Sequence, residues 1–282
     1  MTIRQLIEEG AGILRREGVA EARLDSRLLL QHALGLDHAG LVSRMSDDAD
    51  MPSARLWHSM IARRAGGEPV SRIIGLRSFF GLEFKIGPAV LDPRPDTELL
   101  VERVLADYGD DAPFEFADIG TGSGAIAIAI LANRSRARAS GCDISADALQ
   151  IAMENARRNA VSSRFAAVES DFFERIDGRF DLFVANPPYI GSKDIVLLDR
   201  EVRDHDPLLA LDGGADGLDA YRRILAGGAG ILKEGGKAYL EMGAGQCSQI
   251  EAIAVSSGWK TLGVHKDLAG IERVMTLGLR PA

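Results

Sequence analysis

The chain has 282 residues, of which 46% are hydrophobic and 26% charged, as in an ordinary globular protein with room for two unequal domains. Residues 91–282 hold 21 basic and 30 acidic residues and so carry most of the acidic excess, which disfavours extensive binding to a nucleic-acid backbone. The charged N-terminus lacks the apolar core of a signal peptide, and the longest uncharged apolar run, 125–132, is too short to cross a bilayer, so we expect a cytoplasmic protein without a membrane segment.

Residues 1–70 are predicted to form a small helical domain. Apolar side chains recur there at helical spacing, first at Ile3, Leu6, Ile7, Ile13 and Leu14 and then at Leu24, Leu28, Leu29 and Leu34. Small or rigid residues are interpreted as breaks between the helices, at Gly10, Gly18, Gly35, Pro52 and the Gly66-Gly67 pair. The leucines are those of a helical-bundle core, and no residue pattern in this region indicates catalysis.

Residues 71–95 are predicted to form a β-hairpin connector. Apolar pairs separated by glycines indicate short strands at Ile73-Ile74, Phe79-Phe80 and 84–86. The motif PRPDTE follows at 93–98, and its Asp96 is a candidate N-cap for the next helix. The connector therefore leads into a second domain that begins near residue 96.

From residue 96 to 282 strands and helices alternate. We expect strands at 114–119, 137–143, 164–169, 180–185, 235–242, 258–265 and 271–279, and helices near 97–108, 123–133, 145–159, 217–233 and 245–257. Repeated alternation predicts an α/β domain with a doubly wound parallel sheet covered by helices on both faces. The final two strands are separated by a short turn and are predicted to form an antiparallel hairpin at the end of the sheet.

A glycine-rich turn follows the first of these strands, in FADIGTGSGAIAIAILA at 116–132. Gly120, Gly122 and Gly124 leave space where the backbone must approach a ligand. Dinucleotide-binding proteins have G-x-G-x-x-G at this position, whereas this chain has G-x-G-x-G after an acidic residue, Asp118. The turn indicates a nucleotide-like ligand without defining it.

The next strand ends in an acidic residue, Asp143. In this topology such a carboxylate accepts hydrogen bonds from both hydroxyls of a ribose; alternatively it caps the following helix, a role that Ser145 can also fill. With the acidic turn, Asp143 favours an adenosine-bearing cofactor without a pyrophosphate. S-adenosylmethionine fits because its amino group and sulfonium are cationic, and NAD is the weaker alternative.

The third strand is followed by Glu169-Ser-Asp-Phe-Phe. Asp171 is a candidate partner for the exocyclic amine of adenine, and Phe172 is a candidate for contact with the face of its ring. An ordinary loop with a core phenylalanine explains the same residues equally well.

The fourth strand, 180–185, stops at Asn186-Pro187-Pro188-Tyr189. Two adjacent prolines end both helix and sheet, so the motif is a rigid turn at the end of a strand expected beside the first. The alternative is a structural turn in which the asparagine caps the backbone and the tyrosine covers the core. Because the motif follows the glycine turn and Asp143 in order, a ligand-binding function is preferred.

The NPPY motif suits methyl transfer to a planar NH2 group. Such a nitrogen is a poor nucleophile because its lone pair is conjugated, and its N–H groups become stronger donors as the new bond forms. The side-chain carbonyl of Asn186 and the backbone carbonyl of Pro187 are candidate acceptors that stabilise the transition state more than the ground state. Tyr189 is expected to stack on the flat substrate group, and no catalytic base is needed before transfer.

DIGTGSG at 118–124, the strand that ends in Asp143, NPPY at 186–189 and PRPDTE at 93–98 together resemble the release factor glutamine methyltransferases. The resemblance runs nearly end to end and implies a Rossmann-like class I S-adenosylmethionine-dependent methyltransferase domain after a small N-terminal helical domain. Members of that family methylate the side-chain amide nitrogen (N5) of the glutamine in the Gly-Gly-Gln motif of class 1 peptide chain release factors. NPPY alone is shared with amino methyltransferases of DNA and RNA, whereas PRPDTE and the helical domain narrow the match.

The resemblance implies roles at the matching positions. Cofactor contacts are implied at Asp118, Ile119, Gly120, Thr121, Gly122, Asp143, Phe172 and Asn186. The substrate clamp is implied at Asn186, Pro187, Pro188 and Tyr189. This chain departs from the family where some members have tryptophan in place of Phe172, and where Glu-Pro often replaces Asp206-Pro207. GGADGLDAYRRI at 213–224 also resembles the family, with no chemistry assigned beyond a turn into a helix.

Two other functions remain open. An N6-adenine or other nucleic-acid amino methyltransferase would share the NPPY motif but would need a basic face or a base-reading domain, and a binding protein without catalysis would not need the intact motifs. The scattered histidines and the distant Cys142 and Cys247 indicate neither a metal site nor a disulfide framework. We expect a monomer with no nucleic-acid or membrane partner, in which residues 1–70 dock the release factor or, alternatively, only cap the catalytic core.

Overall fold

The computed structural model describes residues 1–280, and the chain divides into two compact units. The first unit consists of Met1–Gly75 and a return segment, Asp199–His205, and the second consists of Leu76–Leu198 and the residues from Asp206 onward. The predicted hairpin connector therefore belongs mainly to the second unit. The return segment was not predicted, because nothing in its sequence indicates that it belongs to the first unit while the residues before and after it belong to the second.

The first unit is helical, as predicted. Its elements are α1 (Ile3–Arg16), α2 (Ala22–Leu34), α3 (His38–Ser43), α4 (Met51–Ala65), α5 (Val70–Ile74) and, from the return segment, α9 (Arg200–Arg203). The prediction that Gly10 breaks a helix is wrong, because it lies inside α1. A Cβ atom at Gly10 would lie 2.5 Å from both the Ser26 Oγ and a ring carbon of Trp57. The glycine therefore permits close packing of α1 on α2 and α4 rather than ending a helix.

A buried arginine joins the return segment to the helices of the first unit. Arg64 is only 5% exposed, and its Nε donates to the Asp25 Oδ2 at 2.6 Å while its Nη2 donates to the Glu201 Oε1 at 2.5 Å. Because a buried guanidinium needs paired acceptors, Arg64 depends on carboxylates from two separate stretches of the chain.

Ile73-Ile74 is helical, so the prediction of a strand there is wrong. Pro69 begins α5 with a φ of −61°, and Gly75 ends it in the left-handed region at a φ of 78°. These flanking residues decide the conformation over the strand preference of the isoleucines. The rest of the predicted hairpin is confirmed: β1 (Leu76–Phe79) and β2 (Leu82–Lys85) pair antiparallel.

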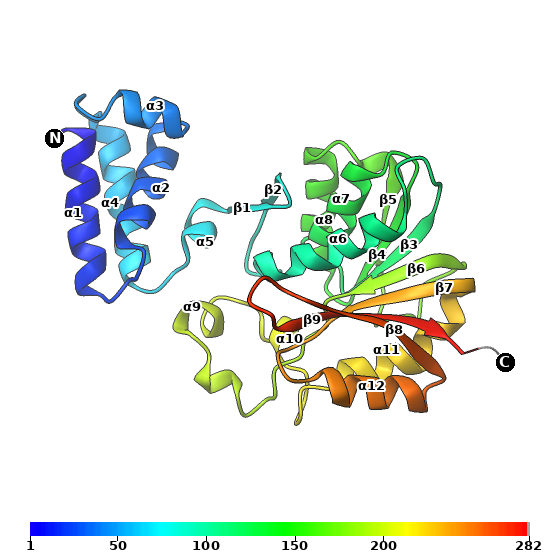
Figure 1. Ribbon diagram of the computed structural model, residues 1–282. Coiled ribbons are helices and arrows are strands. Elements are labelled where there is room, and N and C mark those ends of the chain that lie inside the picture. The colour runs from blue at the N-terminus through cyan, green and yellow to red at the C-terminus, as the bar shows by residue number, and fades with distance from the viewer. Residues whose placement is uncertain (281–282) are drawn as a thin grey trace. The chain divides into compact units, whose positions relative to one another are not determined.

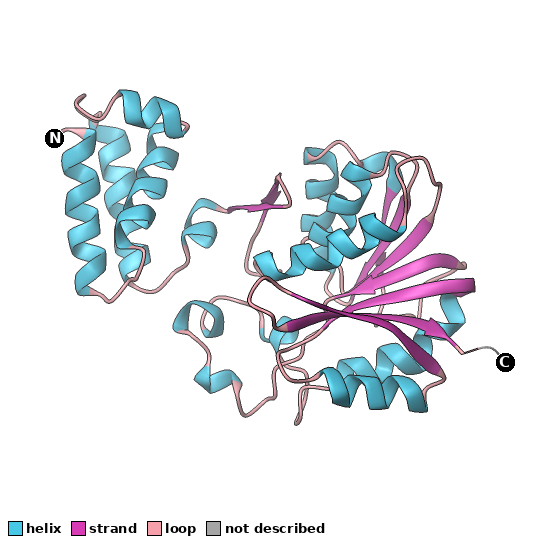
Figure 2. Cartoon of the chain, viewed as in Figure 1, coloured by secondary structure: helices cyan, strands magenta, loops and turns pink. Residues whose placement is uncertain are grey.

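The second unit is built on a seven-stranded sheet with the order β5-β4-β3-β6-β7-β9-β8. Its strands are drawn in magenta in Figure 2. Its strands are β3 (Glu115–Ile119), β4 (Arg138–Asp143), β5 (Phe165–Glu169), β6 (Phe180–Ala185), β7 (Leu232–Glu241), β8 (Trp259–Lys266) and β9 (Glu272–Leu279). The first five of these strands are parallel, whereas β9 runs antiparallel to both β7 and β8. The predicted doubly wound sheet with a terminal antiparallel hairpin is confirmed.

Helices cover both faces of this sheet (Figure 1). One face carries α6 (Glu98–Asp107), α7 (Ala125–Asn133) and α8 (Ala146–Arg158), and the other carries α11 (Asp219–Gly227) and α12 (Cys247–Ser256). Each side has its own buried hydrophobic cluster. The sequence of α7 is apolar on every side because it is buried throughout 125–131.

The predicted helix at 217–233 is too long. After α11 the chain forms a 3-10 turn, η4 (Gly228–Ile231), and β7 already begins at Leu232. At Gly228 a Cβ atom would lie 2.7 Å from the Phe183 ring. The 3-10 turn therefore packs closely on the sheet at the position where the helix was predicted to continue.

Short elements complete the structure: η1 (Pro95–Thr97), η2 (Ser162–Arg164), η3 (Ile195–Leu197) and α10 (Leu208–Leu211). None of the helices in the described part of the chain combines the length and apolarity that a membrane crossing requires.

Candidate active site

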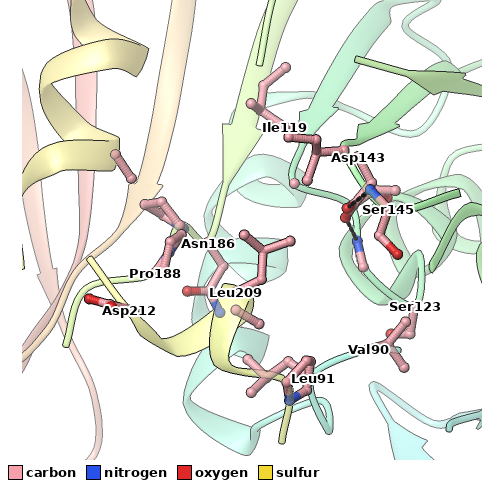
Figure 3. Close-up of a pocket in the computed structure, with 18 of the residues that line it drawn as sticks. Val90, Leu91, Ile119, Ser123, Asp143, Ser145, Asn186, Pro188, Leu209 and Asp212 are labelled. Atoms are coloured by element: carbon pink, nitrogen blue, oxygen red, sulfur yellow. Dashed lines mark hydrogen bonds between the residues drawn. The ribbon is translucent and has the colours of Figure 1, made fainter. Parts of the chain in front are cut away.

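A cavity of about 890 Å³ opens at the carboxyl ends of β3, β4, β5 and β6. Its walls come from the loops that follow these strands, together with residues of 89–97 and 207–223. Figure 3 shows Asp143 and Ser145 on one side of this space and Asn186 and Pro188 on the other. Most of the residues predicted to bind cofactor and substrate, though not Asp118 or Tyr189, thus line one cavity where a doubly wound sheet normally binds its ligand.

The glycine turn after β3 has the backbone that its sequence predicts. Gly120, Gly122 and Gly124 have φ values of 72°, 55° and 79°, in the left-handed region that favours glycine. A Cβ atom at Gly120 or Gly122 would meet no atom within 4 Å, so both positions leave open space in the cavity wall. At Gly124 a Cβ atom would lie 2.8 Å from Ile128 and would prevent the turn from packing on α7.

Asp118 holds this turn in place by accepting hydrogen bonds from it and from the start of α7. It is fully buried, and its Oδ2 accepts hydrogen bonds from the Thr121 hydroxyl at 2.7 Å and the Ala127 amide at 3.3 Å. Burial raises the pKa of this carboxyl to about 7. Of the described residues, Ile119 and Thr121 line the cavity but Asp118 does not. A direct contact between Asp118 and the cofactor stays a prediction.

Asp143 is fixed at the end of β4 by two backbone amides. Its Oδ2 accepts from the Gly122 amide at 2.9 Å and its Oδ1 accepts from the Ser145 amide at 2.9 Å, as the dashed lines in Figure 3 show. The alternative that Asp143 caps α8 is wrong, because the Ser145 side chain caps that helix by accepting from the Ala148 amide. The carboxylate faces the cavity, and each oxygen retains acceptor capacity for ribose hydroxyls.

Phe172 and Asp171 line the cavity beside an arginine that was not predicted. Arg223 lies over the Phe172 ring, with its guanidinium carbon 4.4 Å from the ring centroid, and its Nη2 donates to the Asp171 Oδ2 at 2.7 Å. This arrangement fixes both predicted residues through one partner on α11. A contact of either residue with adenine stays a prediction.

Asn186 follows the last residue of β6 and lies beside the cofactor turn, because β6 pairs with β3. Its Nδ2 donates to the Thr97 hydroxyl at 3.2 Å. Within residues 1–280, neither the Asn186 Oδ1 nor the Pro187 carbonyl accepts a hydrogen bond, and both residues line the cavity. These two oxygens match the predicted pair of acceptors.

Tyr189 is placed differently from its neighbours in the motif. It is partly buried against the hydrophobic cluster under α11 and α12, and it is not among the described residues that line the cavity. Burial raises the pKa of its phenol, and the nearby Glu241 carboxyl adds to this shift. Its carbonyl accepts from the Gln246 Nε2 at 2.9 Å. Stacking of Tyr189 on the substrate stays a prediction.

The glycine-rich segment at 213–217 supports the NPPY motif. The Gly213 amide donates to the Ile190 carbonyl at 2.9 Å. A Cβ atom at Gly213 would lie 2.7 Å from the Pro188 carbonyl, and one at Gly217 would lie 2.4 Å from the Tyr189 carbonyl. The segment 213–217, for which the sequence indicated no chemistry, therefore packs directly against the NPPY motif.

PRPDTE also contacts the site. Thr97 accepts from Asn186, the Arg94 guanidinium pairs with Asp206 at 2.5 Å, and the Asp96 carboxylate pairs with Arg273 at 3.0 Å. The prediction that Asp96 caps a helix is wrong, because no side chain caps η1 or α6. Asp206 keeps a charged partner, although it is shorter than the glutamate common in the family. Among residues 1–280 no group of three or more His, Cys, Asp or Glu side chains could hold a metal ion.

The sheet order, the glycine turn and the acidic strand end define a class I S-adenosylmethionine-dependent methyltransferase. A methyltransferase from Pyrococcus furiosus superposes with a TM-score of 0.54 at 15% identity, covering 78% of this chain and 96% of that one. The hMettl16 catalytic domain, solved with the MAT2A 3′UTR hairpin 6, superposes with a TM-score of 0.57 at 15% identity, covering 79% of this chain and 82% of that one. These similarities concern the fold alone.

The chain belongs to the release factor glutamine methyltransferase family. It is 42% identical to the release factor glutamine methyltransferase of Agrobacterium fabrum, over 93% of this chain and 92% of the relative. The protein of the same name from Bradyrhizobium diazoefficiens is also 42% identical, over 96% and 93%. Residues 5–75 match the PrmC N-terminal domain, and residues 91–203 match the methyltransferase small domain.

Proposed function

We propose that this protein transfers a methyl group from S-adenosylmethionine to the side-chain amide nitrogen (N5) of the glutamine in the Gly-Gly-Gln motif of class 1 peptide chain release factors. The observation that carries the proposal is the pair of acceptors at Asn186 and Pro187, which lines the same cavity as the glycine turn and Asp143. Family membership at 42% identity supports this substrate over other planar amines. In this proposal the protein is a monomer and works in the cytoplasm, where release factors act.

The cavity fits S-adenosylmethionine. It has space for a nucleoside-sized ligand, two glycines that leave its wall open, and an oriented carboxylate, Asp143, for the ribose. Arg223, Asp171 and Phe172 provide a polar edge and a ring face for the adenine. When bound, S-adenosylmethionine supplies an electrophilic methyl group on a sulfonium.

The residues of the NPPY motif bind and orient the glutamine amide. Asn186 Oδ1 and the Pro187 carbonyl accept its two N–H groups, which hold the amide plane so that the nitrogen lone pair is directed at the methyl group. As that nitrogen gains positive charge, both hydrogen bonds strengthen, so the acceptors lower the barrier. The surplus proton then leaves to water, since a protonated amide is a strong acid and needs no enzymatic base.

The test is a methyl-transfer assay with labelled S-adenosylmethionine. The expected result is label on a class 1 release factor, none on a variant with the Gly-Gly-Gln glutamine changed to alanine, and none on DNA or RNA. Mass mapping should place the methyl group on the glutamine side chain. Labelling of DNA or RNA in preference to release factor would favour a nucleic-acid amino methyltransferase instead.

We further propose that residues 1–70 dock the release factor. The acceptor pair can hold any flat amine, so selection of one glutamine must use contacts elsewhere, and a family-specific helical domain is available for this. A chain that starts at Leu76, where the second unit begins, should bind S-adenosylmethionine but lose most activity on intact release factor. It should retain relatively more activity on a short Gly-Gly-Gln peptide. Equal loss on both substrates would instead assign the helical domain a stabilising role.

A further inference from the structure

A buried carboxyl group, that of Glu241, lies next to Asn186 at the end of the sheet. Glu241 is the last residue of β7 and is 2% exposed. In the parallel pairing of β6 with β7, Leu240 is opposite Ala185. The residues that follow them, Glu241 and Asn186, therefore lie next to each other at this end of the sheet. No step of the proposed reaction uses this carboxyl, and a buried acid without a function is costly to maintain.

The surroundings of Glu241 connect it to the Asn186 carboxamide. Burial has the largest effect and raises the pKa of Glu241, and Asp96 raises it further, whereas the neighbouring Thr97 and Asn186 side chains and the Arg273 guanidinium lower it and so favour the charged form. Its Oε2 is buried and accepts no hydrogen bond within residues 1–280. The carboxyl therefore has unused acceptor capacity close to the Thr97 and Asn186 side chains.

Thr97 by itself does not decide which way the Asn186 carboxamide points. A hydroxyl both donates and accepts, so it can pair equally well with the Nδ2 or the Oδ1 of an asparagine. In the structure Nδ2 faces Thr97, which leaves Oδ1 for the cavity. A further group must break this symmetry, because the opposite orientation would present an NH2 group to the substrate NH2 group.

We propose that Glu241 is a positioning residue that fixes the orientation of the Asn186 carboxamide through Thr97. A carboxylate only accepts, so it makes the Thr97 hydroxyl donate toward Glu241 and accept from the Asn186 Nδ2. The Asn186 Oδ1 is then directed at the amine to be methylated. This inference rests on the proposed glutamine methylation, and it adds residues that neither the NPPY motif nor the cofactor site contains.

The variant Glu241→Gln tests the direction of this chain of hydrogen bonds. A glutamine of nearly equal size can donate its NH2 group to Thr97, which frees the hydroxyl to donate to the Asn186 Oδ1 and turns the carboxamide around. We expect kcat to fall by roughly tenfold to 10²-fold, which approaches the loss of a transition-state acceptor. The Kd for S-adenosylmethionine should stay within about twofold of the wild-type value, and the melting temperature should not fall.

Thr97 provides a matched pair of variants. Thr97→Ser keeps the hydroxyl and should retain most of kcat, whereas Thr97→Val keeps the shape, removes the hydroxyl and should lower kcat as much as Glu241→Gln does. The double variant Glu241→Gln/Thr97→Val should be no worse than either single variant, because all of them act through the same carboxamide. A merely structural role would instead follow the thermal stability of each variant.

The pH profile is an independent readout. Burial raises the pKa of Glu241 to about 7, so kcat of the wild type should rise between pH 6 and 8 as the carboxylate forms. The groups facing it are Asp96 before α6, Arg273 on β9, Tyr189 in the motif and Tyr221 on α11, which donates to the Glu241 carbonyl at 2.8 Å. Glu241→Gln should remove this rise. Saturating S-adenosylmethionine removes from the measurement any effect that titration of Asp118 has on cofactor binding.

The possible outcomes separate the two proposals. A wild-type chain that does not methylate release factor overturns the proposed function and this inference with it. An active wild-type chain with an equally active Glu241→Gln variant, or with an unchanged pH profile in that variant, overturns the inference alone. A lower kcat at unchanged cofactor affinity and stability supports it.

Discussion

The two sides of the active-site cavity are held in place by different means. On the cofactor side, Asp143 is fixed by amides of Gly122 and Ser145, which are close to it at the ends of adjacent strands. On the substrate side, Asn186 and Tyr189 depend on remote parts of the chain, namely the side chains of Thr97 and Gln246 and the backbone of the glycine-rich segment 213–217. Asp143 is thus held by backbone amides at the ends of neighbouring strands, whereas Asn186 and Tyr189 are held by groups from remote parts of the chain.

This difference separates binding from catalysis. Changes on the cofactor side should mainly alter the affinity for S-adenosylmethionine, whereas changes on the substrate side should mainly alter kcat. Variants on each side therefore test whether binding and catalysis are separated in this way.

Asn186→Ala should have the largest effect. Loss of one transition-state acceptor lowers kcat by roughly 10²–10³-fold. Cofactor affinity should weaken only modestly, because the adenosine contacts are elsewhere. The measurements are saturation kinetics on release factor and calorimetric titration with S-adenosylmethionine, with the exposed Asn133→Ala as a control. Turnover within a few-fold of wild type would contradict the acceptor mechanism.

Gly217→Ala should come next, because it acts on the support of the motif. The added Cβ would lie 2.4 Å from the Tyr189 carbonyl at a φ of 76°, so the motif must shift by about 1 Å, which can lower kcat by about 10²-fold. Gly258→Ala is a matched control, since its φ is 85° but a Cβ there meets nothing within 4 Å. Both variants should lose stability from backbone strain, and only Gly217→Ala should lose kcat. Equal kcat in the two would show that the support is dispensable.

Asp143→Ala should weaken cofactor binding with less effect on saturated turnover. Two hydrogen bonds from ribose to a charged acceptor are lost, at roughly 1.5–3 kcal/mol each as an upper range, so the Kd should rise well over tenfold. The exposed Asp111→Ala serves as the control for loss of one negative charge. An unchanged Kd by calorimetry would remove Asp143 from the ribose site.

The smallest effect concerns stability and pH. Burial raises the pKa of both Asp118 and Glu241 to about 7, one on each side of the cavity. The unfolded chain has already released these protons at pH 6, so the folded state binds more protons and the free energy of unfolding falls as pH rises through 7. The slope is at most about 1.4 kcal/mol per pH unit for each group.

Denaturant unfolding between pH 6 and 8, without cofactor, measures this slope. Asp118→Asn and Glu241→Gln should each flatten the curve, and the double variant should flatten it most. A wild-type curve that does not fall over this range would mean that the two carboxyls are already ionised in the folded protein.

The sequence predicted the parts of the fold whose signals are local. Alternating strands and helices, the glycine turn and the strand ending in Asp143 all depend on neighbouring residues, and the structure confirms them. Ile73-Ile74 was assigned wrongly because the flanking Pro69 and Gly75 decide its conformation over its strand preference. Gly10 was assigned wrongly because close packing and helix breaking both favour glycine.

The contacts behind the substrate side could not be predicted in the same way. Thr97 was recognised only as part of PRPDTE, and Glu241 only as a residue of a strand. Their proximity to Asn186 follows from the order of strands β6 and β7 and from the entry of the chain into α6. Arg223 was missed for the same reason, since its contact with Phe172 and Asp171 joins α11 to the loop after β5.

The return segment has a consequence for biosynthesis. Domains generally fold as they emerge from the ribosome, which synthesises the chain at about 5–20 residues per second. The helical unit is almost complete at Gly75, yet Arg64 must wait for Glu201, which is made on the order of ten seconds later. In that interval the parallel strands through β6 and the NPPY motif are synthesised. The first unit to emerge is therefore completed only after β3 to β6 of the second unit have been made, and an early stop or frameshift between residues 76 and 200 would leave Arg64 short of one partner.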